Sequence, residues 1–348
     1  MRRKVIAALA IAALALVTVT AASARQSSTV LNGAGSTFVA PLVSVWTPAL
    51  GSAFDYTVQY GGGGSGAGIS QITARSVDFG ASDAPLTPDQ FSACNGCVQI
   101  PWALAGTAMA YNIPGLVLPK NTNLNLSGAV IARIYMGQIT DWSDPAIKAL
   151  NPKATIPSLK ITPVYRTGNS GTSYNFTDFL SSASPAWKSQ LGVGQAVAWP
   201  TGTGASGSSG VSGVVANTPG ALCYVDTGYA LSAHLHFAAI RNQAGKFINP
   251  SIRNVAAAGA TITSVPSNNE LHIVNPPKTA PLAYPIATYT YVILPTKTSN
   301  ATALRKMVFW ALTTGQKPQY TAKLWFAPIP KVVLVASEKA LQQIQPGT

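Results

Sequence analysis

The sequence contains few charged residues, few histidines and few cysteines. Charged residues make up 9% of its 348 positions, well below the usual share of about 25%, and there are only ten acidic residues, three histidines and three cysteines. A hydrophobic content of 47% excludes disorder of the acidic or polyampholyte kind. The 30 glycines and 25 prolines interrupt the chain too often for a coiled coil. A chain of this length is expected to form two ordinary domains.

Basic residues outnumber acidic residues by 23 to 10, which gives a formal charge of +13 at pH 7. This excess of positive charge is compatible with an acidic partner or ligand. The basic residues are not clustered as they are in most nucleic-acid-binding proteins, so no nucleic-acid partner is expected. No Walker A motif is present, which argues against nucleotide hydrolysis by that route.

Long hydrophobic runs are missing except at the N-terminus. Residues 1–24 combine three basic residues at 2–4, an apolar stretch over 5–17 and the small residues 22–24, a pattern typical of a secretory signal peptide that is cleaved after Ala24. The apolar stretch is short for a membrane span, and no other segment approaches the ~18 apolar residues that a span needs. We therefore expect an exported, soluble chain with a charge of +10. No cysteine lies near the cleavage site, so no lipid anchor is expected there.

Two of the three cysteines are close in sequence. Cys94 and Cys97 flank Asn95-Gly96, a turn dipeptide that is able to bring the sulfurs together, and in an exported protein a small disulfide is the favoured interpretation. A redox-active dithiol is the alternative, but no βαβ pattern surrounds the pair. A zinc site lacks further ligands nearby, so no metal is expected. Cys223 lies in the apolar segment 221–225, which predicts a buried strand with a packed free thiol.

Short apolar strands alternate with helical patterns, which predicts an α/β fold. Strands are expected at 56–60, 79–82, 106–111, 161–165 and 291–295, and helices at 66–75, 171–180, 301–313 and 332–344, with further helices starting at Thr87 and Ser127. Residues 201–213 are almost wholly Gly, Ser, Thr and Ala and are predicted to be a mobile loop or tip. His234 and His236 lie in an apolar stretch, which favours packing in a strand over a metal pair.

Two glycine-rich segments precede helical patterns. Residues 33–38 (GAGSTF) permit a tight turn, and Ser36 or Thr37 can cap the helix that follows. Residues 61–66 (GGGGSG) allow the backbone to approach a ligand closely, with Ser65 as an additional hydroxyl donor. A helix start offers free N–H groups and a positive dipole end to an anion. Each segment alone is equally compatible with an ordinary capped helix or a flexible turn.

Two further segments place charged residues at strand ends. Residues 77–85 (VDFGASDAP) bring Asp83 to the end of a strand. There its carboxylate either forms an Asx-turn within the loop or accepts a hydrogen bond from a protonated anion. Residues 164–173 (VYRTGNSGTS) end a strand at Arg166 and open a helix at Ser170, so that a guanidinium and a helix N-terminus face one point. The structural alternative for Arg166 is a surface ion pair, for which Asp178 is the nearest acidic residue in sequence.

These four segments, in this order, resemble the periplasmic phosphate-binding proteins of ABC phosphate importers, the PstS family. The run V-D-F-G-A-S-D-A-P is highly specific for the family. Further matching segments lie at 109–115 (MAYNIPG), 134–142 (IYMGQITDW), 219–230 (PGALCYVDTGYA) and around Tyr284, Pro285 and Ile286. The resemblance extends over nearly all of the mature chain.

The resemblance implies a phosphate site. The implied phosphate-binding residues are Thr37, Phe38, Ser65, Asp83, Arg166, Ser170, Gly171 and Thr172. Thr37 and Phe38 are expected to donate backbone N–H groups, Asp83 to accept the phosphate proton, and Arg166 to provide a charged fork. Two departures from the family pattern stand out: Gly168 occupies the position of an Asp that often pairs with the arginine, and the 61–64 turn is unusually rich in glycine.

The resemblance also implies a two-lobed type II periplasmic binding protein, with the ligand between lobes that close about a hinge. Lobe I is expected to comprise 25–110 and 287–348, and lobe II 111–286, with crossings near 110–114 and 284–287. The implied protein is a monomer in the periplasm. It is implied to need no cofactor and to deliver phosphate to the permease subunits of an inner-membrane ABC transporter that a cytoplasmic ATPase drives.

Other functions fit the residues less well. A receptor for sulfate or another unprotonated oxyanion would confront that anion with the carboxylate of Asp83. A secreted hydrolase would need a G-x-S-x-G nucleophile motif, which neither Ser65 nor Ser170 provides. An adhesive surface protein would leave the ordered anion-facing motifs unexplained. We therefore expect a binding protein and not an enzyme.

Overall fold

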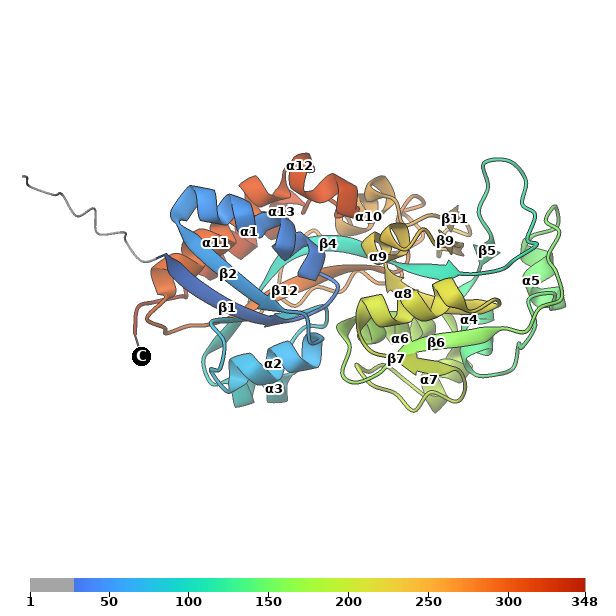
Figure 1. The fold of residues 1–348 in the computed structure, drawn as a ribbon, viewed down its shortest axis with the longest axis horizontal. Coiled ribbons are helices and arrows are strands. Elements are labelled where there is room, and N and C mark those ends of the chain that lie inside the picture. Colours follow the sequence, from blue (N-terminus) through green and yellow to red (C-terminus); the bar gives the residue numbers. More distant parts are fainter. Residues whose placement is uncertain (1–27, 348) are drawn as a thin grey trace, which may run out of the picture.

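The computed structural model describes residues 28–347. The signal peptide expected at 1–24 lies outside the described residues. Within 28–347, none of the helices combines the length and the apolar character that crossing a bilayer requires. Strands and helices alternate along the chain, which confirms the α/β class (Figure 1).

The main sheet contains nine strands in the order β2-β1-β3-β12-β4-β8-β6-β7, with β9 paired to β4. Its strands are β1 (Thr29–Gly35), β2 (Tyr56–Gly61), β3 (Phe79–Ser82), β4 (Cys97–Tyr111), β6 (Thr162–Arg166), β7 (Thr203–Ala205), β8 (Ala221–Asp226), β9 (His236–Phe237) and β12 (Ala287–Pro295). A small second sheet contains β5 (Asn125–Leu126), β10 (Ala239–Arg241) and β11 (Phe247–Ile248).

The long strand β4 joins the two halves of the molecule (Figure 1). Its first part pairs with β12 as far as Gly106, and its last five residues, from Thr107, pair with β8. The change of partner therefore falls inside a strand, close to Ala287, where β12 begins. The residue boundaries of the two lobes remain a prediction.

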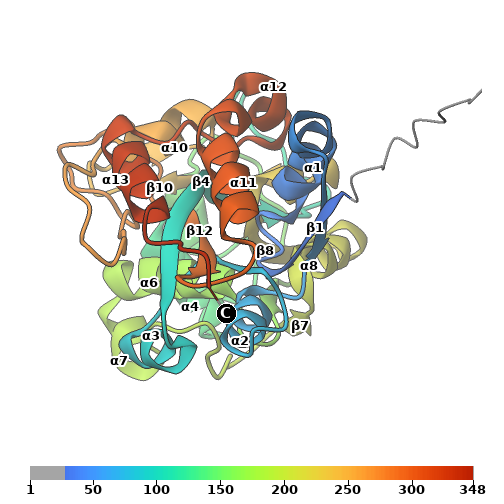
Figure 2. The same cartoon turned by 90° about the vertical axis from the view of Figure 1, so that its left-hand side faces the viewer.

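Helices cover both faces of the sheet. In the first half, α1, α11, α12, α13 and α10 lie on one side and α2 and α3 on the other (Figures 1 and 2). The helices of this half are α1 (Ala40–Phe54), α2 (Ser65–Thr73), α3 (Pro88–Cys94), α10 (Ile252–Gly259), α11 (Ala301–Leu312), α12 (Pro318–Thr321) and α13 (Lys331–Leu341), with 3₁₀ turns η1 (Thr314–Gln316) and η2 (Ala322–Leu324). The second half holds α4 (Gly128–Tyr135), α5 (Pro145–Leu150), α6 (Gly171–Ala183), α7 (Pro185–Gln190), α8 (Gly207–Asn217) and α9 (Thr227–Ser232).

Side-chain caps start many of these helices. Thr87 forms a complete capping box with Gln90 at the start of α3, and the Ser127 hydroxyl accepts the N–H of Val130 at the start of α4. Both caps agree with the helix starts expected from the sequence. Asp226 caps α9 and is also the last of the six buried residues of β8, so that the helix starts directly at the end of the strand.

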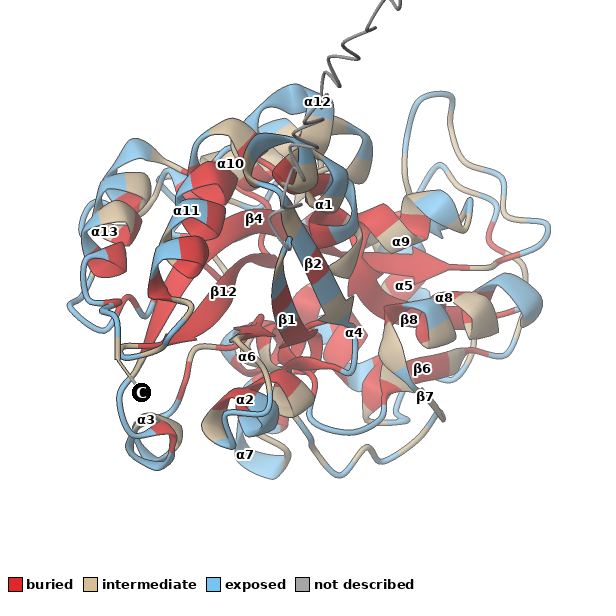
Figure 3. Ribbon diagram, turned by 60° about the vertical axis from the view of Figure 1, so that its left-hand side comes forward, coloured by how far each residue is buried: buried red, intermediate tan, exposed pale blue. Residues whose placement is uncertain are grey.

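The core is continuous across the central strands. All residues of β4 except Cys97 and all residues of β12 are buried, whereas the outer faces of α11 and α13 are exposed (Figure 3). In the second half an aromatic cluster lies beneath the sheet end, where Tyr224 stacks on Phe176 with ring centroids 4.2 Å apart and packs against Tyr135 and Trp199. These rings form a rigid support for the loops that follow β6 and β8.

Residues 201–213 are not a mobile loop, and this expectation was wrong. They form β7, which pairs with β6, and the first half of α8, in which Ser208 and Val211 are fully buried. Small residues are needed because the segment packs closely: a Cβ on Gly202 would lie 2.3 Å from the carbonyl oxygen of Pro163, and one on Gly204 would lie 2.7 Å from Thr167. Composition alone did not distinguish close packing from flexibility.

Two smaller expectations also need correction. The strand predicted at 106–111 is the end of the 15-residue β4, whose earlier part contains Pro101 beside a register shift. Thr290 of β12 pairs with Ala103 and Tyr291 pairs with Pro101, so Trp102 is an extra residue on β4. His236 lies in β9 and its ring stacks on Tyr111 of β4, so packing in a strand is correct for this histidine, although its side chain is exposed. His234 is exposed and lies outside the strand, so the expectation is wrong for it. Among residues 28–347, no group of three or more His, Cys, Asp or Glu side chains is arranged to hold a metal ion.

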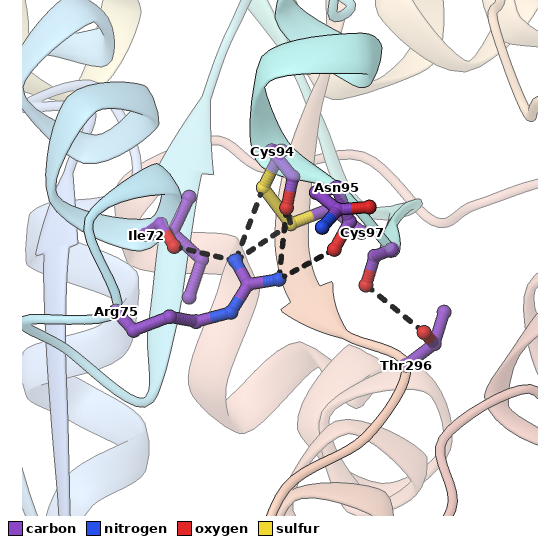
Figure 4. The surroundings of a disulfide bond; sticks show 7 residues. Ile72, Arg75, Cys94, Asn95, Cys97 and Thr296 are labelled. Carbon is purple, nitrogen blue, oxygen red and sulfur yellow. Dashed lines mark hydrogen bonds between the residues drawn. A yellow bond between two sulfur atoms is a disulfide. The ribbon is translucent and has the colours of Figure 1, made fainter. Parts of the chain in front are cut away.

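Cys94 and Cys97 form a disulfide, and Cys223 is a buried free thiol (Figure 4). Arg75, just after α2, holds the disulfide turn in place. Its guanidinium donates to the carbonyl oxygens of Ile72, Cys94 and Asn95 at 2.7, 2.8 and 3.0 Å. The disulfide therefore belongs to a structural brace between α2 and α3, away from the strand ends described next.

Replacing Gly68 with Ala is expected to destabilise the first half of the molecule. Gly68 lies where α2 crosses β1 and β3, and its Cβ would lie 2.6 Å from both the Ala81 carbonyl oxygen and the Gly35 Cα. Because backbone atoms cannot move aside cheaply, Gly68→Ala should lower the free energy of unfolding by about 2–3 kcal/mol in urea denaturation. The matched control is Gly213→Ala in α8, where nothing lies within 4 Å. The control should gain up to about 1 kcal/mol, and equal effects of the two changes would contradict the packing argument.

Candidate anion-binding site

The site is built where parallel strands end. Strands β2, β1 and β3 are parallel in the first half, and β8, β6 and β7 are parallel in the second. Loops after the carboxyl ends of parallel strands are the usual ligand positions of α/β sheets. Asp83 follows β3 directly, and Arg166 is the last residue of β6. The structure brings these two strand ends together from opposite halves.

Asp83 is a buried carboxylate with two hydroxyl donors. It is only 2% exposed; Ser36 Oγ donates to Oδ1 at 2.5 Å and Ser65 Oγ donates to Oδ2 at 3.4 Å. Its backbone carbonyl accepts from Asn175 Nδ2, on α6 of the other half, at 2.7 Å. Burial raises the pKa of Asp83 to about 6, and the hydrogen bond from Ser36 and the charge of Arg166 oppose that rise. Asp83 is therefore ionised at pH 7 and becomes protonated in mildly acidic solution.

The segment Ser36–Phe38 lies between β1 and α1. Ser36 Oγ also accepts the backbone N–H of Phe38 at 3.0 Å, so one hydroxyl links the start of α1 to Asp83. The Thr37 hydroxyl lies 2.9 Å from Ser208 Oγ in the other half. The Phe38 ring is buried in the core against Phe326, which leaves only its backbone to face the site.

Arg166 is a buried cation with no ion-pair partner among residues 28–347. It is 5% exposed, and its Nη1 lies 3.3 Å from Ser208 Oγ and 3.5 Å from Thr172 Oγ1. Its Nε has no hydrogen-bond partner within the described chain. Burial lowers the pKa of Arg166, but a guanidinium remains charged in proteins. Arg166 is therefore not part of a surface ion pair, and Asp178, its nearest acidic residue in sequence, pairs with His272 instead.

The start of α6 closes the site from the second half. Ser170 caps this helix by accepting the N–H of Ser173 at 3.2 Å. Gly171 fits directly against the first half: a Cβ there would lie 2.5 Å from Ser65 Oγ and 2.8 Å from the Asp83 backbone nitrogen. The groups that are expected to contact the ligand therefore come together from both halves of the molecule. Which of these groups contact phosphate remains a prediction.

Three residues of the site were missed from the sequence. Ser36 was considered only as a helix cap, although its hydroxyl also binds Asp83. Ser208 was assigned to a mobile loop. Asp226 is 2% exposed at the end of β8 and was not selected, although it lies inside the matched segment 219–230 and is one of only ten acidic residues. The scarcity of acidic residues was a usable signal for Asp226.

The loop around Gly168 leaves open space where a side chain would lie. Gly168 has φ +73°, is exposed, and has no atom within 4 Å of where a Cβ would lie. No carboxylate therefore reaches Arg166 from this loop. The acidic groups whose charges act on Arg166 are Asp83 and Asp226.

The arrangement suits a small tetrahedral oxyanion. The N-termini of α1, α6 and α8 converge with one guanidinium, several hydroxyls and one acceptor carboxylate. Free N–H groups at helix starts bind anions, and Asp83 provides an acceptor for a proton that the anion carries. Asp83 and Arg166 bring these groups together from the two halves, which is the arrangement of the two-lobed binding-protein class.

Known proteins agree with this class. The profile of the PBP superfamily domain matches residues 20–313. A phosphate-binding protein PstS of Xylella fastidiosa (strain Temecula1) is 35% identical over 313 residues, covering 88% of this chain and 84% of that protein. The PstS protein of Pasteurella multocida is 33% identical and covers 92% of both chains. A putative phosphate ABC transporter substrate-binding protein from Clostridium perfringens, solved with bound phosphate, has the same fold (TM-score 0.63, 16% identity, covering 87% of this chain and all of that one).

The chain belongs to the PstS family of phosphate-binding proteins.

Replacing Gly171 with Ala is expected to hold the two halves apart. The added methyl group would collide with Ser65 and with the Asp83 backbone across the site. In small-angle X-ray scattering with excess phosphate, the variant should have a larger radius of gyration than the unmodified chain. Gly213→Ala is the control, because its Cβ meets nothing. Identical scattering of all three proteins would contradict a tight approach of the halves at Gly171.

Proposed function

We propose that this protein captures inorganic phosphate in the cleft between its two halves and releases it to an ABC importer. The observation that carries the proposal is the buried carboxylate of Asp83 beside an anion seat and the guanidinium of Arg166. A carboxylate in an anion site is unfavourable unless the anion brings a proton to share. Monohydrogen and dihydrogen phosphate do so at neutral pH, whereas sulfate does not.

Arg166 and the hydroxyl and N–H donors are proposed to bind the other phosphate oxygens. These donors lie around Asp83 and Arg166. They are Thr37, Phe38 and Ser65 from the first half, and Ser170, Gly171 and Thr172 at the start of α6. Hydrogen bonds to a charged acceptor are stronger in a desolvated cleft than at the surface. Binding therefore depends on many fixed donors and on one charge.

The family is one of solute-binding proteins, and the site offers no catalytic arrangement that would favour a hydrolase. Of the three histidines, His272 pairs with Asp178 on α6, and His234 and His236 are exposed on the far side of β8 from β6. We therefore propose a receptor without catalytic activity.

Export, location and partners follow from the family. We propose that residues 1–24 direct the chain to the periplasm, where it acts as a monomer. Its partners are proposed to be the permease subunits of an inner-membrane transporter, which a cytoplasmic ATPase subunit powers. These are the roles of a binding protein in an ABC importer, and phosphate is the solute that the site selects.

Removing the charge of Asp83 should change which anion binds. Asp83→Asn places an amide donor where the carboxylate stood, so sulfate should gain at least about tenfold in affinity while phosphate weakens. Arg166→Ala should weaken phosphate by about 100-fold, because it removes charged hydrogen bonds each worth about 1.5–3 kcal/mol. Isothermal titration calorimetry with both anions measures these effects, with exposed Asp89→Asn as the control. Unchanged phosphate affinity in both site variants would sink the site assignment.

Lowering the pH should have the same effect on sulfate affinity as Asp83→Asn. Since the pKa of Asp83 is raised to about 6, the group is ionised at pH 7.5 and largely protonated at pH 5. A protonated Asp83 can donate to an unprotonated oxyanion, so sulfate affinity should increase as the pH falls through about 6. Competition of sulfate with radiolabelled phosphate over pH 5–8 checks this. In Asp83→Asn the sulfate affinity should no longer depend on pH between about 5 and 6.5, where Asp83 titrates in the unmodified chain.

A further inference from the structure

Two buried polar atoms of the site have no hydrogen-bond partner within the described chain: Asp226 Oδ2 and Arg166 Nε. Both residues are more than nine-tenths buried. An unpaired buried donor or acceptor is costly, and such atoms are rare in native proteins. Their occurrence together in one cleft indicates that Asp226 belongs to the anion site.

The sheet topology places Asp226 there. Strands β6 and β8 are parallel neighbours, with Val164 opposite Cys223. Arg166 lies two residues beyond this pair on β6, and Asp226 lies three residues beyond it on β8, so both residues lie at the same, carboxyl end of these parallel strands. Asp226 Oδ1 accepts the N–H of Tyr229 at 3.1 Å and so begins α9, which leaves Oδ2 free for another role.

Ser208 connects Asp226 to the anion-binding groups. Its hydroxyl accepts from Arg166 Nη1 at 3.3 Å and lies 2.9 Å from the Thr37 hydroxyl. It also faces Asp226 closely enough to counteract the rise of that carboxyl's pKa. Ser208 itself is fully buried, so solvent does not screen this network.

The charged and titratable groups around Asp226 come from four elements. Asp83 faces it from the first half, Arg166 from β6, Tyr229 from α9 and Cys223 from β8 itself. Burial, with the charge of Asp83, raises the pKa of Asp226 to about 8, against the opposing effects of the Tyr229 N–H, Ser208 and Arg166. Before any anion binds, the one positive charge of Arg166 therefore lies near two carboxyl groups.

We propose that Asp226 is a second carboxyl group of the phosphate site, which acts on the ligand through Ser208 and Arg166 and takes up a proton when phosphate binds. This inference rests on the proposed function. The proton comes from the buffer and goes to Oδ2, the oxygen without a partner. The neutral acid keeps its Oδ1 bond to α9 and leaves the positive charge of Arg166 to phosphate and Asp83.

The sign of the pH effect follows from linkage. Phosphate adds negative charge near Asp226 and raises its pKa further, so the bound state holds more protons than the free state at and above about pH 8. Phosphate affinity should therefore fall as the pH rises above 8, by up to about tenfold per pH unit from this group alone. Well below pH 7 Asp226 is neutral in both states and contributes nothing.

The test compares the full chain with Asp226→Asn. Asn is as good a helix cap as Asp, so α9 is kept while the titratable group is lost. Phosphate is titrated calorimetrically at pH 6 and pH 8.5, each in two buffers of different ionisation enthalpy, which counts the protons taken up. The ionisation of phosphate itself contributes equally to both proteins and cancels in the difference.

At pH 8.5 the unmodified chain should take up between about half and about three quarters of a proton more per phosphate than Asp226→Asn, and at pH 6 the two should agree. The matched control is Asp144→Asn, an aspartate that caps α5 away from the site and should behave as the unmodified chain does. Equal proton counts at pH 8.5 in a folded Asp226→Asn would overturn the inference. If the unmodified chain binds no phosphate at all, the proposed function fails instead.

A second readout follows the carboxyl groups directly and does not depend on the calorimetric difference between the two proteins. The chain has eight aspartates, so ¹³C-labelled aspartate gives few carboxyl signals. At pH 8.5, phosphate should move one carboxyl signal besides that of Asp83 toward the protonated shift, and Asp226→Glu should remove it. Movement of the Asp83 signal alone would also overturn the inference.

Discussion

A carboxylate buried in an anion-binding cleft is the constraint on which the rest of the structure depends. Asp83 is nearly inaccessible to solvent, and its charge is tolerated only because Ser36 and Ser65 donate to it and Arg166 lies nearby. Desolvation and favourable contacts act in opposite directions on its pKa, which leaves it ionised at neutral pH but easily protonated. A group balanced in this way distinguishes anions by whether they carry a proton.

The second constraint is the close approach of two halves that are distant in sequence. Gly171 touches Ser65 and Asp83, and Gly66 N donates to the carbonyl of Asn169 at 3.0 Å. Any larger side chain at position 171 would occupy the space of the first half. Asn175 fixes the Asp83 backbone from α6, so the same helix that offers its N-terminus to the anion also orients the selecting carboxylate.

Much of this arrangement was predictable from the sequence, because its local signals are strong. The caps at Thr87 and Ser127, the strand end at Arg166 and the helix start at Ser170 all lie where residue types predicted them. The segment 201–213 was not predictable in this way, because Gly and Ser permit both flexibility and close packing. Tertiary contacts with Pro163 and Thr167 decide between them, and a sequence without its neighbours does not contain those contacts.

The same reasoning explains why Asp226 was missed. Its local sequence predicts only a buried strand over 221–225, and the structure confirms that strand, so nothing local indicated a further role for the residue that ends it. Only the parallel pairing of β6 with β8 shows that Asp226 and Arg166 lie at the same end of the sheet.

The charge of the site itself is small, in contrast to the charge of the chain. Asp226, with its pKa raised to about 8, is largely neutral at pH 7, so the charges of Arg166 and Asp83 nearly cancel before phosphate arrives. Attraction between opposite charges is therefore not expected to be the main source of binding. In the proposed site the free energy comes instead from many fixed N–H and O–H dipoles at helix starts, which a desolvated environment makes effective without a large fixed charge. On the same proposal selectivity rests on protons: a dipole-lined site accepts any tetrahedral anion of the right size, and the carboxylate of Asp83 rejects those that bring no proton.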